Sequence, residues 1–122
     1  LKGKIAYISH AMSRTQDGSQ YGFAGPARWV GAGIAASKGA VATVIKSVGT
    51  DNHRNPHTGG TSFPDGVAPI PAGALSVPDA ANLERMFARA VGRPITMKLE
   101  MNPRQIGRTQ SGNVVGEMVG RN

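Results

Sequence analysis

Two histidines and an aspartate lie close together in the segment 51–57, as Asp51, His53 and His57. Imidazole and carboxylate groups are zinc ligands, and three such ligands with one water form the arrangement of hydrolytic zinc sites. Pro56 disfavours the helix that would place both histidines on one face. A turn-forming loop that bonds to its own backbone is the competing interpretation. We favour the loop, because no Glu lies nearby as a general base, and we assign no metal ligand to this chain.

Other catalytic arrangements find little support. The chain contains no cysteine, which excludes thiol nucleophiles, disulfides and Cys-ligated zinc. The Gly-x-Ser-x-Gly turn that presents a nucleophilic serine is absent from the sequence, and His10 follows an expected strand without an identifiable partner. We therefore expect no catalysis by this chain alone.

Residues 31–36 match the pattern Gly-x-Gly-x-x-Ala, and Asp51 follows downstream, as in a dinucleotide-binding fingerprint. That fingerprint requires a strand that runs directly into the first glycine, so that the helix N-terminus meets the pyrophosphate. Here Gly31 falls inside a helix expected to begin near Pro26. The small residues therefore predict a helix that packs closely on a sheet.

The chain of 122 residues is strongly basic, with 14 Lys and Arg against 7 Asp and Glu, for a net charge of +7. Such a balance raises the question of nucleic acid or an acidic membrane surface, and Arg85, Arg89 and Arg93 form a row at helical spacing. The basic residues are otherwise scattered, and aromatic residues for base stacking are few. We predict no nucleic-acid partner and no membrane-spanning segment, since no apolar run approaches about 20 residues.

The first half of the chain predicts one strand, one helix and a second strand. Residues 4–9 form a short apolar run typical of a buried strand. Residues 10–25 are polar and Gly-rich, which predicts a long loop. Pro26 suits the first turn of a helix, Gly39 suits a left-handed cap at its end, and the β-branched run at 40–48 predicts a central strand.

The second half predicts a long loop, a helix and further strands. Residues 49–66 are too polar and turn-rich for regular structure, and loops of this length are often functional. Residues 67–75 contain two prolines and predict an irregular or edge strand. Ser76 with Asp79 resembles a capping box. The helix that it begins carries one apolar stripe, formed by Leu83, Met86, Phe87, Ala90 and Val91.

Alternating apolar residues at 95–101 predict a strand with one solvent-facing side, and Val114 with Val115 predicts a last strand. The sequence begins at Leu1 and shows no signal peptide. We therefore expect this chain to be part of a longer protein.

Taken together, these segments resemble the protease-associated domain. Residues 3–8 (Gly-Lys-Ile-Ala-Tyr-Ile) look like its opening strand, and residues 38–45 (Lys-Gly-Ala-Val-Ala-Thr-Val-Ile) look like the segment after its first helix. Residues 69–76 (Pro-Ile-Pro-Ala-Gly-Ala-Leu-Ser), followed by 79–83, resemble the segment that leads into its second helix.

A narrower resemblance concerns residues 49–59 and 110–115 (Gln-Ser-Gly-Asn-Val-Val). They look like the version of this domain inserted in bacterial two-zinc aminopeptidases, of the exopeptidase family that includes glutamate carboxypeptidase and the transferrin receptor. The resemblance implies a protease-associated domain over 1–110, and a last strand at 111–122 that leads back toward a peptidase domain. The family's zinc ligands lie in that domain, so we expect no cofactor in this chain and zinc in its parent.

The resemblance implies a mixed α/β fold, an open barrel or sandwich of about six to seven strands flanked by two helices. It implies a non-catalytic domain that restricts or orients peptide substrates near the active site of a secreted or periplasmic aminopeptidase. The expected partners are the parent's own peptidase domain and a peptide or protein substrate. A ligand-binding module of a receptor or subtilisin-like protease remains the alternative.

Because recognition favours loops on a rigid scaffold, we expect the loop around Arg14 and the loop 49–66 to face the substrate. The candidate substrate-facing residues in these two loops are Arg14, Gln16, Asp17, Asp51, His53, Arg54, Asn55 and His57.

Overall fold

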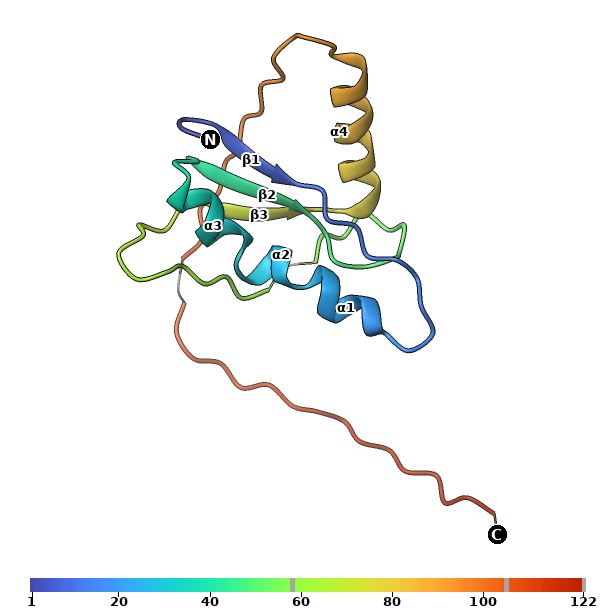
Figure 1. The fold of residues 1–122 in the computed structure, drawn as a ribbon. Helices are drawn as coiled ribbons and strands as arrows, with labels where there is room; N and C mark the ends of the chain where they lie inside the picture. The colour runs from blue at the N-terminus through green and yellow to red at the C-terminus, as the bar shows by residue number, and fades with distance from the viewer. Residues whose placement is uncertain (58, 105, 122) are drawn as a thin grey trace.

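Three parallel strands form the sheet at the centre of the molecule (Figure 1). The computed structural model describes residues 1–57, 59–104 and 106–121. Within them, β1 (Ile5–Ile8), β2 (Ala42–Lys46) and β3 (Ala72–Leu75) pair in the order β1-β2-β3. This arrangement confirms a mixed α/β fold, with the strands expected at 4–9 and 40–48 shortened at their ends.

Helices cover both faces of the sheet. The crossover from β1 to β2 contains α1 (Ser19–Ala24), α2 (Pro26–Trp29) and α3 (Gly31–Ser37), and α4 (Val77–Arg89) follows β3 directly. Successive side chains of a strand point to opposite faces. Accordingly Ala6 packs with Ala35 of α3, whereas the next residue, Tyr7, stacks on Phe87 of α4 with ring centroids 6.0 Å apart.

The Gly-x-Gly-x-x-Ala motif brings α3 close to its neighbours. A Cβ atom at Gly31 would lie 2.7 Å from Cδ1 of Ile8, and one at Gly33 would lie 2.8 Å from the carbonyl oxygen of Ser62. Both glycines are buried. The packing interpretation of this motif is confirmed.

The expected helix ends are also confirmed. Gly39 has a φ of +82°, in the left-handed region that favours glycine. At the start of α4, the Ser76 hydroxyl accepts a hydrogen bond from the backbone N–H of Asp79 at 3.2 Å and donates one to its carboxylate at 2.6 Å. Three expectations were wrong. The helix α1 lies within the segment expected to be a loop, and α4 ends at Arg89, so Val91 lies beyond it. The single helix expected to begin near Pro26 is interrupted at Val30, so that Gly31 is the first residue of α3.

The prediction of six to seven strands in a barrel or sandwich is wrong for the described residues, which contain one three-stranded sheet. Residues 95–101 keep the expected alternation, since Ile95, Met97 and Leu99 are half-buried between exposed neighbours. Ile95 and Met97 line a cleft with Val44 on the α4 side of the sheet. A strand requires a partner with free backbone groups, and among the described residues this segment pairs with no strand of the sheet.

Residues 106–121 run away from the sheet as an extended segment (Figure 1). The expected last strand falls here, and Val114 and Val115 are fully solvent-exposed. The final residue of the predicted segment 111–122, Asn122, lies outside the described residues. Among the described residues, none of the helices has the length and apolar character needed to cross a membrane.

Candidate functional site

Most of the candidate residues lie where the parallel strands end. Strands that run in the same direction place the loops that follow them at one edge of the sheet. The loop after β1 and the loop after β2 therefore meet there, next to the start of α4 (Figure 1). A hydrogen bond from the Arg14 guanidinium to the Thr50 carbonyl oxygen, at 3.1 Å, joins the two loops.

Asp51 lies between the two histidines at the centre of this edge. Its Oδ1 is 3.2 Å from Nε2 of His53, and its Oδ2 is 3.4 Å from Nε2 of His57. The two imidazole rings are 5.6 Å apart between centroids. One potential ligand atom from each of the three residues lies within 4.8 Å of the others. The structure therefore brings Asp51, His53 and His57 together, as their spacing in the sequence allowed.

His57 is held by the end of β2. Its backbone N–H donates to the Ser47 hydroxyl at 2.9 Å, and its ring Nδ1 lies 2.9 Å from the Val48 carbonyl oxygen. The Ser47 hydroxyl in turn donates to the Leu75 carbonyl oxygen at 2.7 Å, which ties the loop to β3. A Cβ atom at Gly49 would lie 3.0 Å from both Asp51 and His57, so the absence of a side chain there lets the cluster close.

His53 and its neighbours are more exposed. The backbone N–H of Asn55 donates to Nδ1 of His53 at 3.2 Å. Arg54 forms an ion pair with Asp79 in the first turn of α4. The Ser76 hydroxyl and then Arg54 lower the pKa of Asp79 below its ordinary value. Arg54 therefore fastens the loop to α4 as well as adding positive charge to this edge.

Gln16 and Asp17 lie outside this cluster, at the start of α1. The Asp17 carboxylate accepts a hydrogen bond from the backbone N–H of Ser19 at 3.0 Å. This bond lowers the pKa of Asp17, because it stabilises the ionised carboxylate. The structure thus gives Asp17 a role in ordering the first turn of α1, on an exposed loop.

Sequence reasoning missed a second polar group, which joins α4 to the sheet. The Tyr7 hydroxyl donates to the Glu84 carboxylate at 2.9 Å, and Lys46 pairs with the same carboxylate at 3.2 Å. Burial, followed by the hydrogen bond to Glu84, raises the pKa of Tyr7. These residues come from three elements that are far apart in the sequence, and no local pattern connects them.

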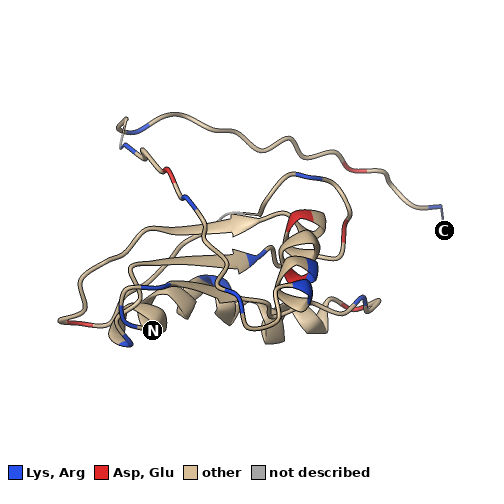
Figure 2. Cartoon of the chain, turned by 90° about the horizontal axis from the view of Figure 1, so that it is seen from above, with Lys and Arg blue, Asp and Glu red and all other residues tan. Residues whose placement is uncertain are grey.

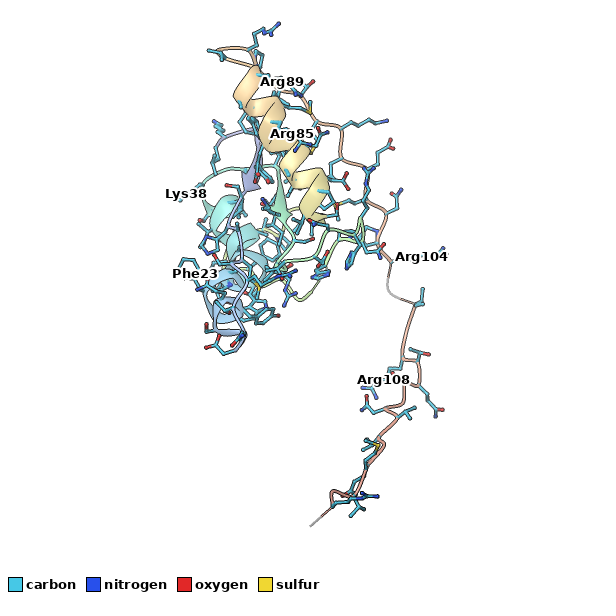
Figure 3. All side chains as sticks on the ribbon, turned by 90° about the vertical axis from the view of Figure 1, so that its right-hand side faces the viewer. Phe23, Lys38, Arg85, Arg89, Arg104 and Arg108 are labelled. Atoms are coloured by element: carbon cyan, nitrogen blue, oxygen red, sulfur yellow. The ribbon has the colours of Figure 1, made fainter. Side chains whose placement is uncertain are left out.

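The basic residues are spread over several elements (Figure 2). Arg85 and Arg89 lie on α4, Lys38 lies at the end of α3, and Arg104 and Arg108 lie on the C-terminal segment (Figure 3). Affinity for nucleic acid increases with the number of phosphates contacted on one face. The distribution of the basic residues over several elements therefore adds no support for nucleic-acid binding.

Comparison with known proteins points to peptidases. No family model matches the chain. The crystal structure of a Peptidase M28 precursor from Shewanella amazonensis SB2B has a similar fold, with a TM-score of 0.71 and 45% sequence identity. The similarity covers 73% of this chain and 20% of that one. The fold thus resembles part of an M28 peptidase.

Among curated proteins the chain is similar to carboxypeptidase Q. Identity to the Mus musculus protein is 36% over 119 residues, which covers 98% of this chain and 24% of the relative. Identity to the Homo sapiens protein is 37% over 93 residues, covering 76% of this chain and 19% of the relative. The chain spans about a quarter of the length of the first of these relatives. Sequence and structure therefore both relate it to a segment of such peptidases.

Proposed function

We propose that this chain is the non-catalytic, protease-associated domain of a longer zinc-dependent peptidase, and that it restricts or orients peptide substrates. The observation that carries this proposal is the similarity of nearly the whole chain, 98%, to one segment that makes up 24% of a carboxypeptidase. About three quarters of that relative lies outside the matched segment. The loops at the carboxyl edge supply a polar surface suited to peptide groups.

The substrate-facing surface in this proposal is the carboxyl edge around Arg14, Asp51, His53 and His57. Arg14 supplies a cation, Asp51 an anion, and the imidazoles supply groups that donate or accept hydrogen bonds. A peptide offers complementary groups in its amides and its charged ends. The hydrogen bonds of His57 to the end of β2 hold this surface on the rigid part of the fold, as recognition loops require.

The parent's own peptidase domain is the second proposed partner. The exposed apolar side chains of the C-terminal segment support this, since they have no packing partner among the described residues: Val114, Val115, Met118 and Val119. Burial of such side chains is favourable at about 25 cal/mol per Å². We propose that the parent is secreted or periplasmic, and this rests only on the resemblance to the protease-associated domain of bacterial aminopeptidases. The proposal that the parent acts as an aminopeptidase rests on the same resemblance.

The test is a change in substrate selectivity of the parent peptidase. His57→Gln keeps the loop length, and deletion of 51–58 removes the loop. We expect both to change the ratios of kcat/KM among a panel of short peptides that differ in their terminal residues, by roughly threefold or more for each lost contact worth about 0.7 kcal/mol or more. Asp65→Asn, at an exposed turn residue that is not part of the cluster, is the control and should leave the ratios unchanged.

Unchanged ratios in both loop variants, with full metal content and normal folding, would reject the proposed role. A uniform loss of activity toward every peptide would also reject substrate selection, since it would indicate a structural contribution to the parent.

A further inference from the structure

We propose that Asp51, His53 and His57 form a binding site for a divalent transition-metal ion, and that zinc fits it best. This site is separate from the zinc expected in the parent's peptidase domain. The proposal rests on the arrangement of the three side chains and on the groups behind them.

The hydrogen bond of His57 determines where its proton lies. The Val48 carbonyl oxygen, 2.9 Å from Nδ1, can only accept a hydrogen bond, so Nδ1 carries the hydrogen. In a neutral imidazole the other nitrogen, Nε2, then presents a lone pair. That nitrogen lies 3.4 Å from the Asp51 carboxylate, which is also an acceptor. With His57 neutral, two acceptors face each other, and either a metal ion between them or a proton on Nε2 resolves the conflict.

The separations suit a small ion. Ligand atoms of a tetrahedral zinc ion with bonds of about 2.0–2.1 Å lie roughly 3.3 Å apart. Oδ1 of Asp51 lies 3.2 Å from Nε2 of His53 and Oδ2 lies 3.4 Å from Nε2 of His57, so each carboxylate oxygen is near the ligand separation for one imidazole. The group as a whole spans up to 4.8 Å, so one ligand must move inward.

His53 is the ligand that can move, since its side chain is 49% exposed. In the structure its Nδ1 accepts a hydrogen bond from the backbone N–H of Asn55, so in a neutral ring Nε2 carries the hydrogen and donates it to Asp51. On binding, Nε2 gives up this hydrogen, and Nδ1 takes one as its bond to Asn55 is lost. The partial exposure of all three side chains leaves a fourth position for water.

The surroundings of the site orient its ligands. A metal-bound histidine usually donates its second ring N–H to a carbonyl or carboxylate, and the Val48 carbonyl serves His57 in this way. Gly49 leaves the room in which Asp51 and His57 approach. Two imidazoles with one carboxylate suit zinc, whereas calcium and magnesium prefer oxygen ligands alone. Bound zinc would join residues 51 and 57 and close the loop upon β2.

The test is titration of the 122-residue chain with zinc chloride by calorimetry, with cobalt(II) as a spectroscopic substitute. We expect one ion per chain and the intense visible bands of four-coordinate cobalt. His53→Gln, His57→Gln and Asp51→Asn should each weaken zinc binding at least tenfold. His10→Gln and Asp65→Asn remove the same groups elsewhere and should change the affinity less than twofold. Circular dichroism of each variant confirms that it is folded.

Long-range ¹H–¹⁵N spectra of the histidines provide a second measurement. We expect hydrogen on Nδ1 of His57 both before and after zinc is added, with a shift of the Nε2 resonance on binding. Non-stoichiometric binding, or equal losses in the His10→Gln control, would overturn the proposal. So would a His57 ring with hydrogen on both nitrogens that zinc leaves unchanged, because a proton would then occupy the place of the metal. No peptidase activity is measured, so this test is independent of the proposed function.

Discussion

Replacement of Gly33 by alanine tests whether the small-residue motif of α3 is a packing device. The new Cβ atom would lie 2.8 Å from both the Ser62 carbonyl oxygen and Cδ of Pro64. Ser62 has little freedom to retreat, since its backbone N–H donates to the Trp29 carbonyl oxygen at 2.8 Å and its hydroxyl donates to the same oxygen at 3.0 Å. The close contact must therefore be relieved by strain in α3 or in residues 62–64.

Two opposing terms determine the size of the effect. Alanine in place of glycine within a helix gains about 0.5–1 kcal/mol. Overpacking at a site that cannot expand costs about 1–3 kcal/mol, and the backbone oxygen of Ser62 places Gly33 toward the upper part of that range. We expect Gly33→Ala to lower the free energy of unfolding by about 1–2 kcal/mol, or roughly 3–10 °C in Tm for a domain of this size.

Gly22→Ala is the matched control, because Gly22 lies in α1 and a Cβ atom there would meet no other atom within 4 Å. We expect this variant to be up to about 1 kcal/mol more stable than the parent chain. Thermal and urea unfolding of both variants, followed by circular dichroism, provides the comparison. Equal stabilisation by the two substitutions would refute the packing argument for α3.

Two further variants test the attachment of α4. Ser76→Ala removes the cap and should lower the free energy of unfolding by about 1 kcal/mol in urea. Because the Ser76 hydroxyl is the main cause of the lowered pKa of Asp79, the same variant should raise that pKa in an NMR titration. The stabilisation linked to Asp79 is present above its ordinary value near 3.8 and is lost as the pH falls through the lowered pKa. Tyr7 has a raised pKa, so the stability linked to it is present below its ordinary value of 10.0 and is lost as the pH rises above that value. Tyr7→Phe should abolish this alkaline loss in urea unfolding between about pH 8 and pH 11, and an undiminished loss would show that other groups cause it.

The elements with local signals could be predicted from the sequence. The β-branched run of β2, the cap formed by Ser76 and Asp79, and Gly39 each act within a few residues, and the structure confirms all three. The helix α1 escaped prediction, because its sequence (Ser-Gln-Tyr-Gly-Phe-Ala) is short and contains a glycine. The preference of such a helix is too weak to be read without the packing around it.

The strand expected at 95–101 shows the opposite error. Its alternation correctly predicted which side chains are half-buried, since Ile95, Met97 and Leu99 face the molecule. Alternation reports only that one side of an extended chain is apolar, whereas a strand also needs a neighbour with free N–H and C=O groups. Whether such a neighbour is present depends on the fold, and the prediction of six to seven strands was too high because it did not take this requirement into account.

The sequence by itself determined the α/β class, the small-residue contact surface of α3, the cap of α4 and the residues 51–57 as a polar loop. Only the tertiary structure decided that Arg14 bonds to Thr50, and that the Val48 carbonyl directs His57 toward Asp51. Propensity and capping act between neighbours along the chain. The site depends on the parallel direction of β1, β2 and β3, which brings their carboxyl ends to one edge of the sheet, and on backbone groups that no side-chain pattern reveals.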